Sequence, residues 1–232
     1  MVDNRRIGAK IYNLWLKIRY LTPEIWSYKK MYSIFEKYRL ILSRIAAVIV
    51  LFFLFSTQSY WETKNETITF SLFCTGLIFV AIASLGRMWC SLYIAGYKDD
   101  KLVTEGPYSI CRNPLYFFSM VGVIGIGCAT ETFAFPIVFI LLFALYYPFV
   151  IKSEEKRLKQ LFGVAFDEYT KRVPAFFPRF STFSEPKEYL VKPAVYRNHI
   201  FSALWFVWLV GALEVIEGLR EIGLLSSIWS LY

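Results

Sequence analysis

Histidine is almost missing from this 232-residue sequence, which contains His199 alone. A metal site or proton relay based on histidine would have to be built around that one residue. The four cysteines form no CxxC pair, and each lies in or beside an apolar run, as buried thiols do. We therefore predict no metal site, and we expect His199 to have a structural role at a helix end.

Polar residues are also scarce for a soluble protein. Hydrophobic residues make up 56% of the chain and aromatic residues 19%, and the mean hydropathy is +0.44. Soluble domains usually contain about 45–50% apolar residues. The composition therefore predicts an integral membrane protein.

Four apolar stretches have spanning or near-spanning length, and a fifth, shorter one precedes Glu214 and Glu217. The third and fourth are separated only by residues 130–132, so they are expected to form a tight antiparallel helical hairpin over about 115–151. The fold class is therefore an all-α integral membrane protein with four to five transmembrane helices and cytoplasmic amphipathic helices. The five stretches are about 40–55, 68–90, 115–129, 133–151 and 200–213.

The positive charges predict an orientation. Ten Lys and Arg residues fall in 1–44, four in 87–112 and ten in 152–198, out of 26 in the chain. Four alternating helices put these three segments on one side, which the positive-inside rule assigns to the cytoplasm. The N-terminus is then cytoplasmic, and the net charge of +8 reflects topology and attraction to anionic lipid headgroups instead of nucleic-acid binding.

The chain divides by composition into three parts. Residues 1–38 form a basic N-terminal arm, which is either an amphipathic helix on the membrane surface or a solvated arm. Residues 39–180 form the membrane core, and 181–232 a C-terminal extension with a further apolar helix. Within the core, 152–172 is expected to be a cytoplasmic amphipathic helix with a possible break at Gly163.

Polar residues at both ends of the hairpin are the candidates for chemistry. Pro114 suits the first turn of the third helix, whose free N–H groups favour a carboxylate. Arg112 beside it is a bidentate partner for a carboxylate or phosphate, or an ordinary arginine at a membrane boundary. Because the hairpin is antiparallel, Glu154 and Glu155 lie at the same level. Either could hold an amino group or accept a proton, or form an ordinary surface pair.

The motifs in this region resemble one enzyme superfamily. They are LVTEGPY at 102–108, RNPLY at 112–116, Glu154-Glu155 followed by Leu158, Phe162-Gly163 and Tyr169, and Val173-Pro174. Together they are similar to the integral-membrane methyltransferases related to isoprenylcysteine carboxyl methyltransferase and phosphatidylethanolamine N-methyltransferase. The resemblance covers about 87–178.

The resemblance implies a cytoplasmic S-adenosylmethionine site and a lipophilic substrate that enters from the bilayer. Methyl transfer of this kind needs alignment and a dry pocket and no metal. The implied residues for catalysis or substrate orientation are Arg112, Glu155, Glu154 and, on the substrate side, Arg87. Those implied for cofactor binding are Val103, Gly106, Pro107, Tyr108, Asn113, Pro114, Tyr116 and Glu154.

One position departs from the family pattern, and several alternatives stay open. The family usually has Arg-His-Pro where this chain has Arg112-Asn113-Pro114, so a titrating imidazole is replaced by an amide that still donates and accepts hydrogen bonds. The acceptor could be a prenylcysteine carboxylate, a phospholipid amine, or a small apolar thiol or acid. The other readings are an NADPH-dependent membrane sterol-type reductase and a non-enzymatic membrane scaffold.

Overall fold

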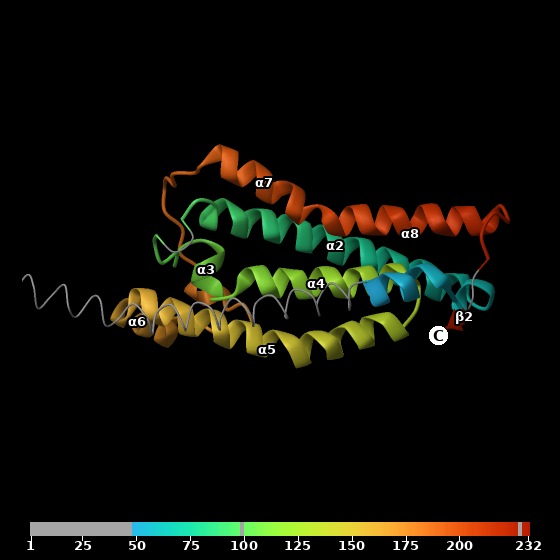
Figure 1. The fold of residues 1–232 in the computed structure, drawn as a ribbon, viewed down its shortest axis with the longest axis horizontal. Coiled ribbons are helices and arrows are strands. Elements are labelled where there is room, and N and C mark those ends of the chain that lie inside the picture. Colours follow the sequence, from blue (N-terminus) through green and yellow to red (C-terminus); the bar gives the residue numbers. More distant parts are fainter. Residues whose placement is uncertain (1–47, 98–99, 227–228) are drawn as a thin grey trace, which may run out of the picture. The chain divides into compact units, whose positions relative to one another are not determined.

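The computed structural model describes residues 48–97, 100–226 and 229–232 (Figure 1). The basic arm expected at 1–38 and the first half of the first apolar stretch, residues 40–47, lie outside these residues. The chain divides into two units, 1–53 and 54–232. The described part of the first unit is helical. Everything that follows concerns the second unit.

The second unit is built mainly from helices. Asn65 begins the first long one by accepting a hydrogen bond from the Ile68 N–H, which satisfies a free donor of the first turn. Helix α2 packs along α4, α4 packs along α5, and α7 and α8 pack against α2 (Figure 1). The helices are α2 (Glu66–Ile94), α3 (Pro107–Ile110), α4 (Pro114–Ala129), α5 (Ala134–Phe162), α6 (Val164–Arg172), α7 (Pro193–Ala203) and α8 (Trp205–Glu221), with short 3-10 turns η1 (Trp61–Thr63) and η2 (Phe180–Thr182).

Three segments of the described chain are long and apolar enough to cross a membrane: Glu66–Ile94, Ala134–Phe162 and Pro193–Glu221. Helix α4 is apolar too, but it is only 16 residues long. Many large apolar side chains on these helices are exposed, such as Leu145 and Phe149 on α5, as lipid-facing residues are. The protein is therefore a multi-pass membrane protein.

The expected hairpin is present as α4 and α5, joined by a short turn at 130–133. The structure corrects the expectation for 152–172. Residues 152–162 continue α5 without a break, because this stretch contains no proline or glycine, and Gly163, with a φ of 51°, ends the helix. Only α6 is a separate amphipathic helix, and it buries Phe166 and Tyr169.

The C-terminal region also differs from expectation. The fifth apolar stretch is longer than 200–213, since α7 and α8 follow each other with only Leu204 between them. His199 lies inside α7 and not at its end. A small parallel sheet pairs β1 (Thr57–Ser59) with β2 (Trp229–Leu231), which the all-α prediction missed because three-residue strands carry no periodicity.

Candidate active site

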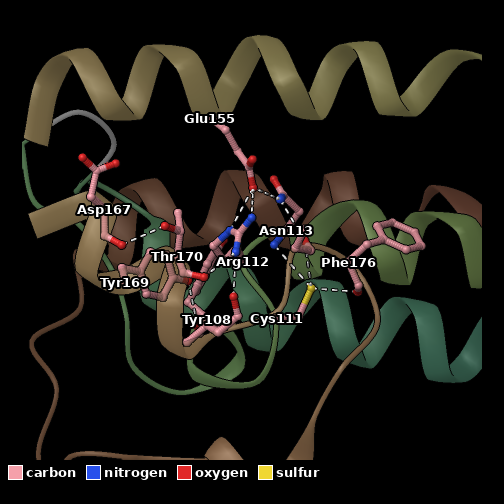
Figure 2. A network of polar contacts seen from close by, with 11 residues as sticks. Tyr108, Cys111, Arg112, Asn113, Glu155, Asp167, Tyr169, Thr170 and Phe176 are labelled. Atoms are coloured by element: carbon pink, nitrogen blue, oxygen red, sulfur yellow. Dashed lines mark hydrogen bonds and ion pairs between the residues drawn. The ribbon is translucent and has the colours of Figure 1, made fainter. Parts of the chain in front are cut away.

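The motif residues meet where α4 begins. Arg112 directs Nε and Nη2 at one oxygen of Glu155, Oε1, at 2.9 and 2.8 Å (Figure 2). Its Nη1 donates to the backbone carbonyls of Thr170 and Val173 at 3.1 and 2.7 Å. The arginine side chain is 13% exposed and the glutamate 23%. A partly buried guanidinium thus ties the start of α4 to α5 and to the end of α6.

Asn113 contributes to the same network. Its Nδ2 donates to the Ala175 carbonyl at 2.9 Å and approaches Glu155 Oε1 at 3.4 Å. Asn113 is the N-cap residue of α4, yet its side chain makes no capping bond. The positive end of the α4 dipole is therefore left without a side-chain cap beside Glu155. Within the described residues, all the hydrogen bonds and ion pairs of Glu155 use Oε1 and none uses Oε2.

The chain after α6 forms one wall of the site. The Arg112 N–H donates to the Pro174 carbonyl. The Cys111 thiol donates to the Phe176 carbonyl at 2.9 Å (Figure 2). Burial raises the pKa of the Cys111 thiol to about 11, so the thiol stays protonated and remains a donor. Further along, Thr182 and Ser184 bond to Ser109. The sequence did not predict this wall, because an extended segment has no periodic pattern of hydrophobic residues. The Val173-Pro174 motif was the one part of it that the sequence indicated.

The segment around Gly106 is held rigidly. Gly106 has a φ of 59°, which side-chain-bearing residues rarely adopt, and a Cβ there would overlap the Tyr93 ring. Pro107 begins α3 and is buried. Tyr108 is buried as well, and its backbone carbonyl accepts from the Tyr169 hydroxyl at 2.6 Å. These contacts place the Tyr108 ring inside the protein.

The Tyr108 hydroxyl is a buried donor without a partner among the described residues. Burial raises the pKa of this phenol well above its ordinary value, so it remains protonated. Such an unsatisfied polar group is costly in a native protein and suggests a missing ligand. This region thus has two features that a polar ligand would satisfy, the Tyr108 hydroxyl and the uncapped start of α4.

The other site residues predicted from the sequence lie around the Arg112–Glu155 network or outside it. Pro114 is buried at the first turn of α4, and the Tyr116 ring meets Tyr147 of α5 edge-on at 5.4 Å. Val103 packs in a cluster with Tyr108. Glu154, one position before the site glutamate, pairs instead with Arg157 at 2.5 Å along the same helix.

Arg87 lies apart from the Arg112 network, deeper between the helices. Its Nη1 donates to Ser119 Oγ at 2.5 Å, and its Nη2 to Ser202 Oγ at 3.3 Å. Ser119 follows Asn113 by six residues on α4, a rise of about 9 Å. Neither serine stood out in the sequence, since a single serine in an apolar helix carries no signal.

The partners of Arg87 within the described chain are neutral. The guanidinium lies 5.7 Å from the centre of the buried Phe206 ring. Its Nε is buried without a partner in the described residues. An intramembrane cation without a countercharge is expensive and is usually functional.

Within the described residues, no group of three or more His, Cys, Asp or Glu side chains could hold a metal ion.

Comparisons with known proteins show which sequences this chain is similar to. The phospholipid methyltransferase family model matches residues 65–165. The chain is 37% identical over 201 residues to the nickel-cobalt-cadmium resistance protein NccN of Alcaligenes xylosoxydans xylosoxydans, covering 87% of this chain and 93% of that protein. It is 36% identical over 195 residues to the cobalt-zinc-cadmium resistance protein CzcN of Cupriavidus metallidurans, covering 84% and 89%.

A relative named as an enzyme is also similar. The chain is 32% identical over 143 residues to protein-S-isoprenylcysteine O-methyltransferase B of Arabidopsis thaliana, covering 60% of this chain and 69% of that protein. No solved structure gave a significant match. The chain therefore belongs to the superfamily of integral-membrane methyltransferases that includes the isoprenylcysteine and phospholipid methyltransferases.

Proposed function

We propose that this protein transfers a methyl group from S-adenosylmethionine to a lipophilic acceptor at the cytoplasmic side of a membrane. The observation that carries the proposal is the contact between Arg112 and Glu155, which joins the RNPLY segment to the glutamate pair at the uncapped end of α4. Two sequence motifs 43 positions apart thus form one polar site. The cytoplasmic assignment rests on the distribution of positive charge.

The residues that would hold the cofactor have distinct roles. Glu155 offers Oε2 to an ammonium group, and the first turn of α4 offers its dipole to a carboxylate. The buried Tyr108 hydroxyl supplies a further hydrogen bond. Arg112 acts mainly as a positioning residue, because its donors already point at Glu155 and at two carbonyls. When bound, S-adenosylmethionine would supply an electrophilic methyl group on a sulfonium.

Arg87 is proposed to orient the acceptor. Its charge has no carboxylate partner in the described chain, and it lies between α2, α4 and α7. A carboxylate on the acceptor would neutralise that charge with charge-assisted hydrogen bonds. Alignment of two reactants can lower the activation free energy by on the order of 7–11 kcal/mol. This favours an acid acceptor, as in isoprenylcysteine carboxyl methylation, over an amine or thiol, which would need a base to take its proton.

An acceptor panel tests this assignment. Purified protein with labelled S-adenosylmethionine would be given a prenylcysteine acid, a phosphatidylethanolamine or an apolar alkyl thiol, and label in the organic phase would be measured. We expect methylation of the acid, and we expect Arg87→Gln to raise its KM more than it lowers kcat. Methylation of the amine or thiol alone, at equal rates in both proteins, would contradict the role of Arg87. Methylation of none of the three would remove the support for a lipophilic acceptor of these classes.

A further inference from the structure

An apolar groove lies between the C-terminal end of α2 and the first turns of α7. Its volume is about 650 Å³, and its lining is almost entirely apolar. None of its residues takes part in the Arg112–Glu155 network. They are Leu92, Val191, Pro193, Ala194, Tyr196, Arg197 and Ile200.

The groove sits where two membrane-spanning segments meet the membrane boundary. Helix α2 ends at Ile94, and the segment that contains α7 begins at Pro193. The chain before the groove is held to the end of α2, because Tyr97 donates to the Leu190 carbonyl and Lys192 to the Gly96 carbonyl. One wall of the groove is therefore fixed in place. An open apolar groove at this level would be filled by hydrocarbon.

The charges around the groove indicate that a ligand bound there carries a negative group. Arg197 is the one charged residue in the lining, and its side chain is exposed. No acidic residue of the described chain forms an ion pair with it. Pro193 and Ala194 belong to the first turn of α7, so the positive end of that helix dipole faces the same groove. An anionic group beside a hydrocarbon chain complements both features, and the guanidinium of Arg197, in the second turn of α7, is a good phosphate partner.

We propose that this groove binds an anionic phospholipid, with an acyl chain along Leu92 and Ile200 and its phosphate at Arg197. The bound lipid is a resident partner and not the methyl acceptor. The proposal does not depend on the proposed function, because it concerns a different surface and needs no turnover.

Native mass spectrometry of the full chain tests the proposal. Protein released from detergent would be equilibrated with phosphatidylglycerol or phosphatidylcholine of identical acyl chains. We expect retention of one phosphatidylglycerol in preference to phosphatidylcholine. Arg197→Gln should lower that preference about fivefold, the effect of one basic residue near a lipid headgroup. Ala194→Trp, which fills the groove, should lower retention of both lipids.

Arg172→Gln is the matched control, since it removes one exposed arginine from α6 and should leave the preference unchanged. Equal retention of the two lipids by the wild type, or an unchanged preference in Arg197→Gln, overturns the proposal. A dimer that Ala194→Trp dissociates, with no lipid preference, would assign the groove to a second copy of the chain instead. Transfer of label from S-adenosylmethionine to phosphatidylglycerol would make the lipid an acceptor, which also contradicts it.

Discussion

Arg112 holds a single oxygen of Glu155 with two of its nitrogens, Nε at 2.9 Å and Nη2 at 2.8 Å. The remaining terminal nitrogen, Nη1, is committed to the carbonyls of Thr170 and Val173. Because Arg112 is itself held by these two carbonyls, it fixes the orientation of the whole Glu155 carboxylate, including its second oxygen, Oε2. This relationship makes the carboxylate a rigid acceptor, as a cofactor site requires.

Replacing either member of this pair should disable the site. Arg112→Ala leaves the partly buried Glu155 carboxylate without its cation. Glu155→Ala leaves the partly buried Arg112 guanidinium without its carboxylate. We expect each to cost about 2–4 kcal/mol in unfolding free energy and to abolish turnover, while membrane insertion is preserved. Thermal denaturation in detergent and methyl-transfer assays would measure both effects.

Glu154→Ala is the informative comparison for that pair. Within the described residues, Glu154 pairs with Arg157 on the same helix, a partly exposed pair worth about 0–1 kcal/mol. Glu154→Ala should therefore lose much less activity than Glu155→Ala. Near-normal turnover in Glu155→Ala or Arg112→Ala would show that the site has been placed wrongly.

Two glycines with similar backbone conformations provide a second test. Gly106 has φ 59° and ψ −129°, and Gly163 has φ 51° and ψ −122°. Alanine at either position incurs backbone strain of about 1–3 kcal/mol. Only at Gly106 would the new methyl group overlap a neighbour, the Tyr93 ring; at Gly163 nothing lies within 4 Å.

We therefore expect Gly106→Ala to lower the unfolding free energy by about 1–3 kcal/mol more than Gly163→Ala does. It should also weaken cofactor binding, since the Tyr93 ring and the start of α3 must move. Melting curves of the two variants in one detergent give the comparison. Equal losses of stability would mean that the Tyr93 contact does not constrain this segment.

Phe206 links a glycine of α4 to the intramembrane arginine. A Cβ at Gly122 would come within 2.5 Å of the Phe206 ring, which lies 5.7 Å from the Arg87 guanidinium. Gly122→Ala should therefore push this ring against Arg87, cost about 1–3 kcal/mol and raise the KM for the acceptor. Gly211→Ala on α8 meets open space and should be neutral or slightly stabilising. Unchanged kinetics in Gly122→Ala would exclude this coupling.

Glu131, in the turn between α4 and α5, should make stability depend on pH. Burial, aided by the carboxylates of Glu217, Glu62 and Glu214, raises its pKa from the ordinary 4.5 to about 7. The folded state therefore binds the proton more tightly than the unfolded chain. The contribution of the Glu131 carboxyl to the free energy of unfolding is fully present below about pH 4.5 and is lost as the pH rises through about 7.

Because Glu131 is only half-buried, we expect a loss of about 1 kcal/mol over that window. Glu131→Gln has no proton to release, so it should flatten this part of the stability curve. Melting temperatures of both proteins across pH 4–8 would measure the difference. Parallel curves would mean that the carboxyl is solvated in the folded protein.

Much of the fold could be predicted because the signals were local. Pro114 marked the start of α4, the short polar turn at 130–132 marked the hairpin, and Gly163 marked a break. The antiparallel hairpin then required Arg112 and the glutamate pair to lie at one level, and the structure brings Arg112 and Glu155 into contact.

The rest depended on packing that no periodicity encodes. Glu154 and Glu155 differ by about 100° around one helix, so only the packing of α5 on α4 decides which one faces Arg112. The charges after residue 151 suggested a new helix, whereas the backbone simply continued to Phe162. Ser119 and Ser202 became partners of Arg87 through the approach of α2, α4 and α7.

The most direct test of the account is a binding titration of the purified full chain in detergent. S-adenosylmethionine and NADPH would be added separately and the heat of binding measured, with circular dichroism confirming that the protein is folded. We expect saturable binding of S-adenosylmethionine, lost in Glu155→Ala, and no binding of NADPH. A folded protein that binds NADPH, or that does not bind S-adenosylmethionine, would contradict the proposed function.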